Sequence, residues 1–587
     1  MKAKKILTML LSGVLAVSAL AGCGGGDSTS GGNADTSAAT QSNAAGDASA
    51  DATGGAAAGD TQVLNIRATA FGNNYDVQDM GWRWMMAACY SGLYRNVADE
   101  EGEHFILDGA ESVDISEDGT VYTFHLRQDA KWSDGEPVTA HDYEYGWKRL
   151  LNPEYAYDYA SFIFNVVGAQ EYYNGEGSAD DVQAVAVDDY TFEVTLKVAD
   201  PTFESKLVAT PLYPTRQDLA EAAGDQWGKD WSLCVYNGPY CMSELVEDNR
   251  MTWTKNENYW NKDETHLETI NWYLVAEDST AATMFDNGEL DILQTSGDYA
   301  LKYQAEAEAG NLTMINAPYP GVDAISYEFT NGGLSGLMGN VKIRKALAYS
   351  INREELVEVV YGGKYQPAYG YVAPAISFDG TSYRDQVEEP MKAMYDEYAG
   401  DPEKLQALFQ EGLDELGVTT PMSDITITYL SQGSTVEQQA LREYLQQVWQ
   451  QNLGIKVELN TVGDSSLFIA ERDSYNYDVC SSGWWSDYND PLDVLYTLYS
   501  DTYTSYGYYS NPEYDALADS LTGENDSAKR LEIYTAMEQM IFDDSAIIPI
   551  CYETKQYFVK PWVKDFRWSS FGASQEFYIT YIEGRGY

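Results

Sequence analysis

Aromatic and acidic side chains crowd the segment 481–491, which reads SSGWWSDYNDP. Trp484, Trp485, Asp487 and Tyr488 combine large apolar faces with hydrogen-bonding edges, a combination favoured where a surface must be apolar and polar at once. A carboxylate among such rings can accept a charge-assisted hydrogen bond from a cation. The segment is therefore a piece of core, an active site or a place where a ligand is held.

Motifs of catalytic and metal-binding chemistry are missing from the sequence. The four histidines are isolated and form no HExxH pattern. No GxSxG nucleophile motif occurs, and Gly362-Gly363-Lys364 is followed by Tyr365, where a phosphate-binding loop requires the hydroxyl of Ser or Thr. We therefore predict no catalytic residue, no metal site and no cofactor, and we expect that the protein is not an enzyme.

The size and the charge of the chain limit its possible domain organisation and binding partners. A chain of 587 residues is too long for one hydrophobic core, since single cores stop growing at about 250–300 residues, so two or three lobes are expected. The net charge of -56 repels the phosphates of nucleic acids and anionic lipid surfaces, which excludes nucleic acid as a partner. The 47 tyrosines and 14 tryptophans suit a ligand cleft.

The N-terminus has the pattern of an export signal. Lysines within the first five residues precede an apolar run at 6–21 that is short for a bilayer span, so residues 1–22 are predicted to be a signal peptide. The sequence LAGC at 20–23 resembles the lipobox of bacterial lipoproteins, in which the cysteine is lipidated and becomes the new N-terminus. Cys23 is the predicted lipidation site; the alternative is a plain signal peptide followed by a chance cysteine.

A low-complexity segment follows the lipobox. Residues 24–60 contain no aromatic residue and no Leu, Ile, Val or Met, so they cannot offset their ordering entropy. We predict that 23–61 is a lipidated cysteine with a disordered tether, whose end-to-end distance is roughly 30 to 37 Å. The folded part is then extracytoplasmic and held near the cell membrane by its lipid anchor.

The other five cysteines show no regular spacing. An odd number without a CxxC pattern predicts neither a disulfide framework nor a metal site. Cys234 and Cys241 are close enough in sequence to pair in an oxidising exterior, but two buried thiols are the favoured interpretation.

The folded part reads as mixed α and β. A helix is predicted over 434–454, because Ser434 and Glu437 have capping-box spacing and a glycine follows the last turn. It lies between the strand-like segments 425–430 and 455–459, a strand–helix–strand unit of the α/β type. Two further segments alternate apolar and polar residues as strands do: 122–127 and 191–197.

One long stretch is specific enough to indicate a family. Residues 122–153, YTFHLRQDAKWSDGEPVTAHDYEYGWKRLLNP, closely resemble the signature of extracytoplasmic solute-binding proteins of the peptide/nickel class, which feed ABC importers. Within that class the segment 481–491 looks most like the oligopeptide-binding lipoproteins. Other family landmarks follow in order: VYNGPY at 235–240, NENYW at 256–260, GELDIL at 288–293, VKIRKALAYSINRE at 341–354, DSAIIPICY at 544–552 and VKPWV at 559–563.

The signature itself has a plain structural interpretation. Asp134-Gly135 is typical of a turn, and Thr139 is a plausible N-cap of the helix that follows. The motif therefore identifies the family without forming the site.

The resemblance implies an α/β fold of the periplasmic-binding-protein type, cluster C-like. Two lobes close on a hinged cleft, with hinges near 325 and 548, and an extra subdomain is attached. The implied parts are lobe I at 62–90, 236–325 and 549–587, the extra subdomain at 91–235, and lobe II at 326–548.

The resemblance also implies ligand-binding residues. In oligopeptide-binding relatives the aspartate matched by Asp487 pairs with the α-ammonium of the peptide, as a charge-assisted hydrogen bond in a closing cleft. Gly483 and Trp485 match positions whose main chain pairs with the extended peptide. Trp484 matches a residue that walls a side-chain pocket, and Tyr159 matches a tyrosine beside the peptide N-terminus.

Two departures from the family pattern concern specificity. Ser481 stands where some members carry an arginine that meets the C-terminal carboxylate of a short peptide, which puts that anchor in doubt. The LDP-type motif expected near the N-terminus is blurred to Tyr75-Asp76-Val77.

The sequence thus predicts a monomeric substrate-binding lipoprotein that captures short peptides and delivers them to the permease subunits of an ABC importer. A signalling peptide, a sugar or a metal chelate is the alternative ligand on the same fold. A secreted hydrolase is a third possibility, for which no nucleophile–base pair argues.

Overall fold

The computed structural model describes residues 61–79, 87–99, 102–433, 435–500, 502, 508–572 and 575–585, and the fold below is that of the unit Gly59–Tyr587. The predicted signal peptide, Cys23 and most of the tether lie outside the described residues. Within them, no helix combines the length and the apolar character needed to cross a membrane.

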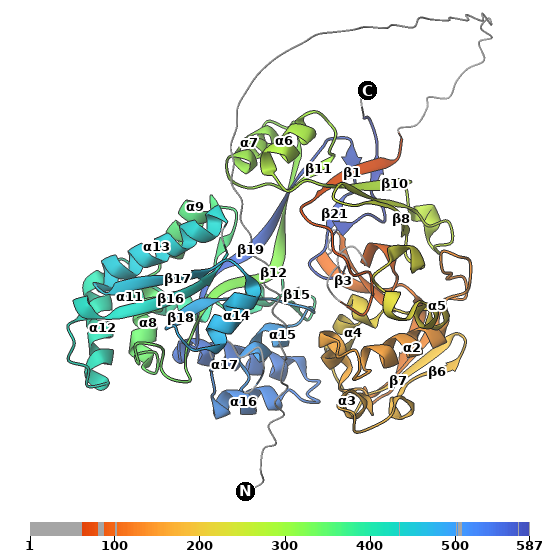
Figure 1. Ribbon diagram of the computed structural model, residues 1–587. Coiled ribbons are helices and arrows are strands. Elements are labelled where there is room, and N and C mark those ends of the chain that lie inside the picture. The colour runs from red at the N-terminus through yellow and green to blue at the C-terminus, as the bar shows by residue number, and fades with distance from the viewer. Residues whose placement is uncertain are drawn as a thin grey trace, which may run out of the picture. The chain divides into compact units, whose positions relative to one another are not determined.

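A large mixed sheet runs through the molecule (Figure 1). In spatial order its strands are β17 (Lys456–Val462), β16 (Thr426–Gln432), β18 (Val479–Trp485), β12 (Thr313–Tyr327), β19 (Ile547–Val559), β11 (Ile292–Leu293), β1 (Val63–Ala68), β10 (Thr269–Leu274), β9 (Arg250–Lys255) and β8 (Tyr240–Val246), with β13 (Gln366–Pro367) also on β19.

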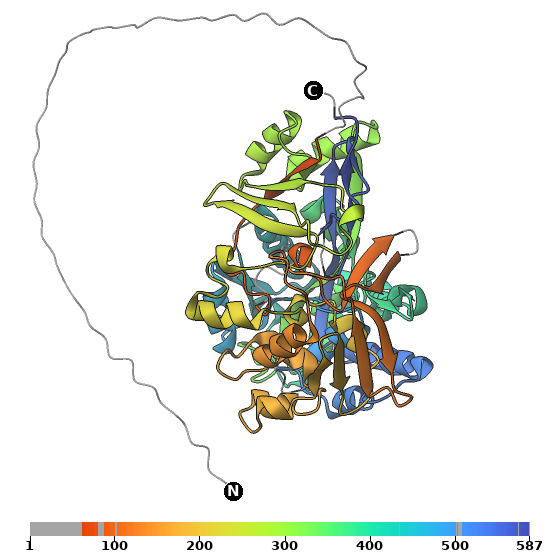
Figure 2. The same ribbon diagram turned by 90° about the vertical axis from the view of Figure 1, so that its right-hand side faces the viewer.

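Strands β12 and β19 are the long antiparallel pair that links the two ends of this sheet (Figures 1 and 2). Their pairing is interrupted between Pro318 and Val322, where Pro318 and Pro320 have no N–H to donate to the ladder. On one side of the interruption Val322 and Ile325 belong to one hydrophobic core, and on the other Tyr557 belongs to a second.

The pairing of β12 with β19 is irregular a second time between Asp323 and Ala324, next to the expected hinge position near 325. Ile325 and Ile548 both belong to the first core. The hinges near 325 and 548 stay a prediction.

The predicted strand–helix–strand unit is confirmed. Strands β16 and β17 pair in parallel on either side of α13 (Val436–Leu453), which Gly454 ends in the left-handed conformation. The capping box, however, is formed by Thr435 and Gln438 and not by Glu437, and Ser434 lies outside the described residues. Both pairs have the same sequence spacing, so the pattern alone did not separate them.

A second, four-stranded antiparallel sheet is covered by α2 (Ala140–Leu150) and lies within the range 91–235 that is predicted to be the extra subdomain. Thr139 caps α2, since its backbone N–H donates to Asp142 Oδ2 at 2.8 Å and completes a capping box, as predicted. The two strands predicted at 122–127 and 191–197 are confirmed. The sheet order is β4 (Ala110–Ile115), β5 (Val121–Leu126), β7 (Thr191–Thr195) and β6 (Ala184–Asp188).

The remaining helices are α3 (Ala169–Tyr173), α4 (Phe203–Lys206), α5 (Gln217–Ala223), α6 (Asp278–Asp286), α7 (Gly297–Glu308), α8 (Val341–Tyr349), α9 (Arg353–Tyr361), α10 (Tyr383–Gln386), α11 (Pro390–Tyr398), α12 (Pro402–Glu415), α14 (Ser465–Asp473), α15 (Pro491–Leu495), α16 (Pro512–Asp519) and α17 (Ser527–Asp543). The strand pairs outside the two larger sheets are β2 (Tyr94–Asp99) with β3 (Gly102–Leu107), β14 (Ser377–Phe378) with β15 (Thr381–Ser382), β20 (Val563–Lys564) with β23 (Tyr581–Ile582), and β21 (Arg567–Trp568) with β22 (Gln575–Glu576).

The described cysteines are all thiols. Cys234 and Cys241 form no disulfide, in line with the favoured interpretation, but both are only half-buried. Burial raises the pKa of Cys241 to about 11, so the thiol form prevails at neutral pH.

Candidate ligand-binding site

Strand β18 carries the first half of SSGWWSDYNDP. It pairs with β12 along its whole length, with Ser481 opposite Ile325 and Gly483 opposite Asp323. On its other side β16 pairs with β18 only at Val479 and Cys480. Within the described residues, the stretch from Ser481 onward therefore has a strand neighbour on the β12 side only.

Gly483 fits closely against β12. Its φ is 157°, and a Cβ atom at this position would lie 2.7 Å from the backbone oxygen of Val322. Any side chain here must push β12 and β18 apart, so the glycine permits the close approach of the two strands.

The two tryptophans point to opposite faces of β18, as successive residues of a strand do. Trp484 packs against the core, and its Nε1 donates to Asp493 Oδ2 at 2.7 Å. Trp485 is 41% exposed, and its Nε1 donates to Glu553 Oε1 at 2.9 Å. One tryptophan of the pair is therefore part of the core and the other lies at the surface, a difference that the sequence did not reveal.

Beyond the end of β18, Asp487 meets a residue of the extra subdomain. The hydroxyl of Tyr159, in the short 3-10 helix Asp158–Ile163, donates to Asp487 Oδ1 at 3.1 Å. Beside them the ring of Phe162 contacts the ring of Tyr488 edge to face, with ring centres 5.8 Å apart. The structure thus brings together Tyr159 and Asp487, two of the residues predicted for one end of a ligand.

A second carboxyl group lies beneath Asp487. The backbone N–H of Asp487 donates to Asp493 Oδ2 at 3.0 Å. Burial, followed by the negative charge of Asp487, raises the pKa of Asp493 to about 8. Burial and the charge of Asp487 therefore both favour the protonated form of Asp493.

The end of the motif is a helix cap. The side chain of Asp490 accepts from Leu492 N at 2.8 Å at the start of α15, with Pro491 in its first turn. Asp490 also forms a buried ion pair with Arg530 at 2.9 Å. Both contacts give Asp490 a structural role at the start of α15.

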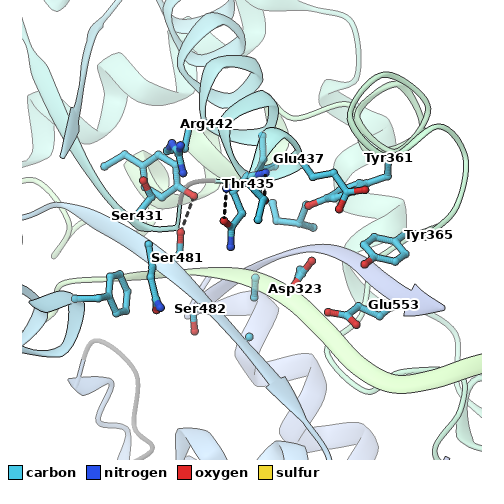
Figure 3. A pocket seen from close by; sticks show the side chains of 18 of the residues that line it. Asp323, Tyr361, Tyr365, Ser431, Thr435, Glu437, Arg442, Ser481, Ser482 and Glu553 are labelled. Atoms are coloured by element: carbon cyan, nitrogen blue, oxygen red, sulfur yellow. Dashed lines mark hydrogen bonds between the residues drawn. The ribbon is translucent and has the colours of Figure 1, made fainter. Parts of the chain in front are cut away.

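A cavity of about 590 Å³ adjoins the open side of β18 (Figure 3). Ser481, Gly483 and Trp485 line it, whereas Tyr159, Trp484 and Asp487 do not. Its other walls come from β12, β16, β19, the end of α9 and the starts of α13 and α14, through Asp323, Ala324, Tyr361, Tyr365, Tyr429, Ser431, Gln432, Thr435, Glu437, Gln438, Leu441, Arg442, Phe468, Ile469, Arg472, Ser482, Ile550 and Glu553.

The Ser481 end of this cavity is hydroxyl-rich and basic. Ser481 Oγ and the Tyr429 hydroxyl are 2.9 Å apart, and Arg442 lies beside them (Figure 3). The guanidinium of Arg442 donates to the backbone oxygen of Gly433 at 3.0 Å.

The opposite end is acidic. Asp323 and Glu553 line it with Tyr365, whose pKa is raised by burial and then by the charges of Glu553, Asp323 and Glu437. Burial, followed by the charge of Glu553, also raises the pKa of Asp323 to about 7. Sequence reasoning missed these residues because they come from β12, α13 and β19 and share no motif; Glu437, predicted as a cap, lines the cavity instead.

The blurred LDP-type motif has a structural role. Asp76 forms a buried ion pair with Arg149 at 2.6 Å and accepts a hydrogen bond from the Tyr157 hydroxyl at 2.7 Å. It does not line the cavity. Nor do the described residues hold any group of three or more His, Cys, Asp and Glu side chains that could bind a metal ion.

Comparison with known proteins extends the resemblance over most of the chain. The family described as "Bacterial extracellular solute-binding proteins, family 5 Middle" matches residues 105–506. The chain is 31% identical over 470 residues to the periplasmic oligopeptide-binding protein OppA of Escherichia coli (strain K12), a match covering 80% of this chain and 82% of that protein.

Solved structures agree with this match. The substrate-binding domain of an oligopeptide ABC transporter from Bacillus anthracis superposes with a TM-score of 0.73 at 27% identity, over 89% of this chain and 99% of that one. Listeria monocytogenes OppA bound to peptide superposes with a TM-score of 0.72 at 27% identity and the same coverage. The predicted two-lobed periplasmic-binding-protein fold is confirmed, and the chain belongs to the bacterial extracellular solute-binding proteins of family 5, the peptide/nickel class that its motifs resemble.

Proposed function

We propose that this protein is the substrate-binding component of an ABC importer and captures short peptides. The observation that carries the proposal is the open side of β18 from Ser481 to Trp485, which faces a cavity of about 590 Å³. An extended peptide can add there as a strand, since main-chain groups of an exposed strand edge bind any sequence while pockets take alternate side chains. The names of the relatives, which include oligopeptide-binding proteins, support this ligand class.

In this proposal Asp487 pairs with the α-ammonium of the peptide. The Tyr159 hydroxyl already donates to Oδ1 and holds the carboxylate in place. Because burial and the charge of Asp487 favour the protonated form of Asp493, one negative charge would face one positive charge, which is the balance that a desolvated ion pair requires. Gly483 and Trp485 supply main-chain partners.

Trp484 has a different position from the other proposed contacts. Its indole N–H is engaged by Asp493, and the ring packs against the core. We infer that it walls the ligand site from beneath by fixing Asp493 and the turn to Asp487, because both Trp484 Nε1 and Asp487 N donate to the same carboxyl oxygen.

The test of the ligand class is mass spectrometry of what co-purifies with the full-length protein. A mixture of short peptides is expected. A single sugar, metal chelate or unique signalling peptide would replace the proposal with one of those ligands. A peptide library incubated with the metal-free protein should remain intact, and cleavage would instead favour a hydrolase.

We further propose that the protein is a monomeric lipoprotein, anchored through Cys23, that delivers its ligand to permease subunits in the membrane. The apolar run followed by LAGC supports the anchor. Labelling of cells with a fatty acid should mark the wild-type protein and not Cys23→Ser. Equal labelling of the two would exclude lipidation at this residue.

A further inference from the structure

The acidic end of the cavity is only partly balanced by the protein's own cations. Among the described residues Lys555 is paired with Glu553, at 3.1 Å, and its charge also acts on Asp323, but neither Asp323 nor Glu437 forms an ion pair. The Asp323 carboxylate accepts a weak hydrogen bond from the Cys551 thiol at 3.6 Å. Buried or half-buried carboxylates are normally paired, so Asp323 and Glu437 each lack a directly paired cation in the described part of the chain.

The two arginines that line the cavity do not supply that partner. Arg442 lies at the Ser481 end of the cavity (Figure 3), where its positive charge interacts with the Tyr429 hydroxyl. Its guanidinium donates a hydrogen bond to the backbone oxygen of Gly433. The positive charge of Arg472 interacts with Cys480, the residue before Ser481, and Arg472 forms an ion pair with Asp473 at 3.2 Å. Both positive charges are therefore held toward the other end.

The walls of the acidic end suit a long side chain with a charged tip. Tyr361 and Tyr365 lie with ring centres 4.6 Å apart and offer apolar faces, and Lys364 Nζ lies 4.8 Å from the centre of the Tyr365 ring. The two ring faces thus line the path toward the carboxylates.

We propose that this cavity is a specificity pocket for a positively charged side chain, the ammonium of lysine or the guanidinium of arginine, which Asp323, Glu437 and Glu553 bind. The inference rests on the proposed peptide-binding function and adds the class of peptide, namely basic ones. An extended ligand that begins at Asp487 runs back along β18 at about 3.3 Å per residue, so its third residue or a later one reaches the cavity.

The experiment is isothermal titration calorimetry with alanine-based pentapeptides that have a free amino terminus and carry Lys, Gln or Glu at one position each. At one position from the third onward, Lys is expected to bind about tenfold more tightly than Gln, because a charge-assisted hydrogen bond replaces a neutral one. Glu at that position should bind more weakly than Gln.

The variant Glu437→Gln should reduce the preference for Lys over Gln, measured as the ratio of the two affinities, by at least about threefold. Glu443→Gln is the matched control, since Glu443 is on the same helix, is exposed and does not line the cavity; it should keep the preference. Glu553→Gln provides a second test and should act as Glu437→Gln does.

Two results would overturn the inference. Binding of all peptides with no preference for Lys at any position, or a preference that Glu437→Gln and Glu553→Gln both leave intact, removes the cationic pocket while peptide binding stands. Failure of every peptide in the series to bind removes the proposed function together with the inference. The two failures are therefore distinguishable.

Discussion

The hydroxyl of Tyr159 donates to Asp487 Oδ1 at 3.1 Å, although the two residues are 328 positions apart. Tyr159 lies in the 3-10 helix Asp158–Ile163 and Asp487 in the turn after β18, so the contact joins two segments that are far apart in the sequence. A carboxylate held in this way is preorganised for a cation, because its orientation is set before the ligand arrives. This relationship underlies the first prediction.

Asp487→Ala should weaken the binding of a free-amine peptide by roughly 10- to 100-fold, the equivalent of a charge-assisted hydrogen bond of about 1.5 to 3 kcal/mol. The measurement is calorimetry with one peptide and its N-acetylated form. The acetylated peptide lacks the ammonium and should bind both proteins equally. Tyr159→Phe keeps the carboxylate and should cause a smaller loss. Equal affinity of Asp487→Ala and wild type for the free-amine peptide would remove Asp487 from the site.

Gly483→Ala should lower both stability and peptide affinity, because the new Cβ would lie 2.7 Å from the Val322 oxygen and force β18 away from β12. A loss of about 1–3 kcal/mol in the free energy of unfolding is expected. Gly463→Ala is the control, since a Cβ there meets no atom within 4 Å. Denaturant unfolding of the two variants measures the difference, and equal stabilities would contradict the close approach.

Asp493→Asn should change the pH dependence of stability. Burial raises the pKa of Asp493 to about 8, so folding favours its protonated form. That stabilisation is complete below the ordinary carboxyl pKa, is lost as pH rises toward 8, and stays lost above it, with a slope of at most about 1.4 kcal/mol per pH unit. Asn keeps the acceptor oxygen for Trp484 and Asp487 but does not ionise.

The Tm of Asp493→Asn relative to wild type should therefore increase from pH 5 to pH 8 and then level off. The difference between the two proteins is the quantity to measure, since it cancels other titrating groups such as Asp323. A difference in Tm that is the same at every pH would mean that Asp493 is ionised in the folded protein.

Ser481→Arg introduces the arginine that the family resemblance leads us to expect at this position. It should increase affinity for a tripeptide with a free C-terminal carboxylate several-fold, as a charge-assisted pair does, and leave the C-terminally amidated tripeptide unchanged. Ser481→Gln is a neutral control of similar reach. Calorimetry that finds the same gain for acid and amide forms would show that the new side chain acts by packing alone.

Local sequence patterns identified helices and strands correctly where a pattern was compatible with a single structure. The alternation at 122–127 and the unit over 425–459 were predictable from side-chain period and turn residues, and Thr139 from its position before a helix. The cap of α13 was misassigned because Ser434 with Glu437 and Thr435 with Gln438 have identical spacing. That Glu437 lines the cavity and does not cap α13 is visible only in the tertiary structure.

The tryptophan pair shows the same limit. The alternation of side chains along a strand places Trp484 and Trp485 on opposite faces of β18, but this alternation does not show which face is covered by other residues. The neighbours decide it: Asp493 and the core take Trp484, while Glu553 and the cavity take Trp485.

The sequence by itself determined the family, the mixed α/β class and the segment around Asp487, because the order of the motifs and the residue types can be read directly from it. The tertiary structure alone decided the open side of β18, the raised pKa of Asp493 and the acidic cavity. Each depends on charges or strand partners brought together from distant parts of the chain, and a short-range pattern carries no information about distances of that kind.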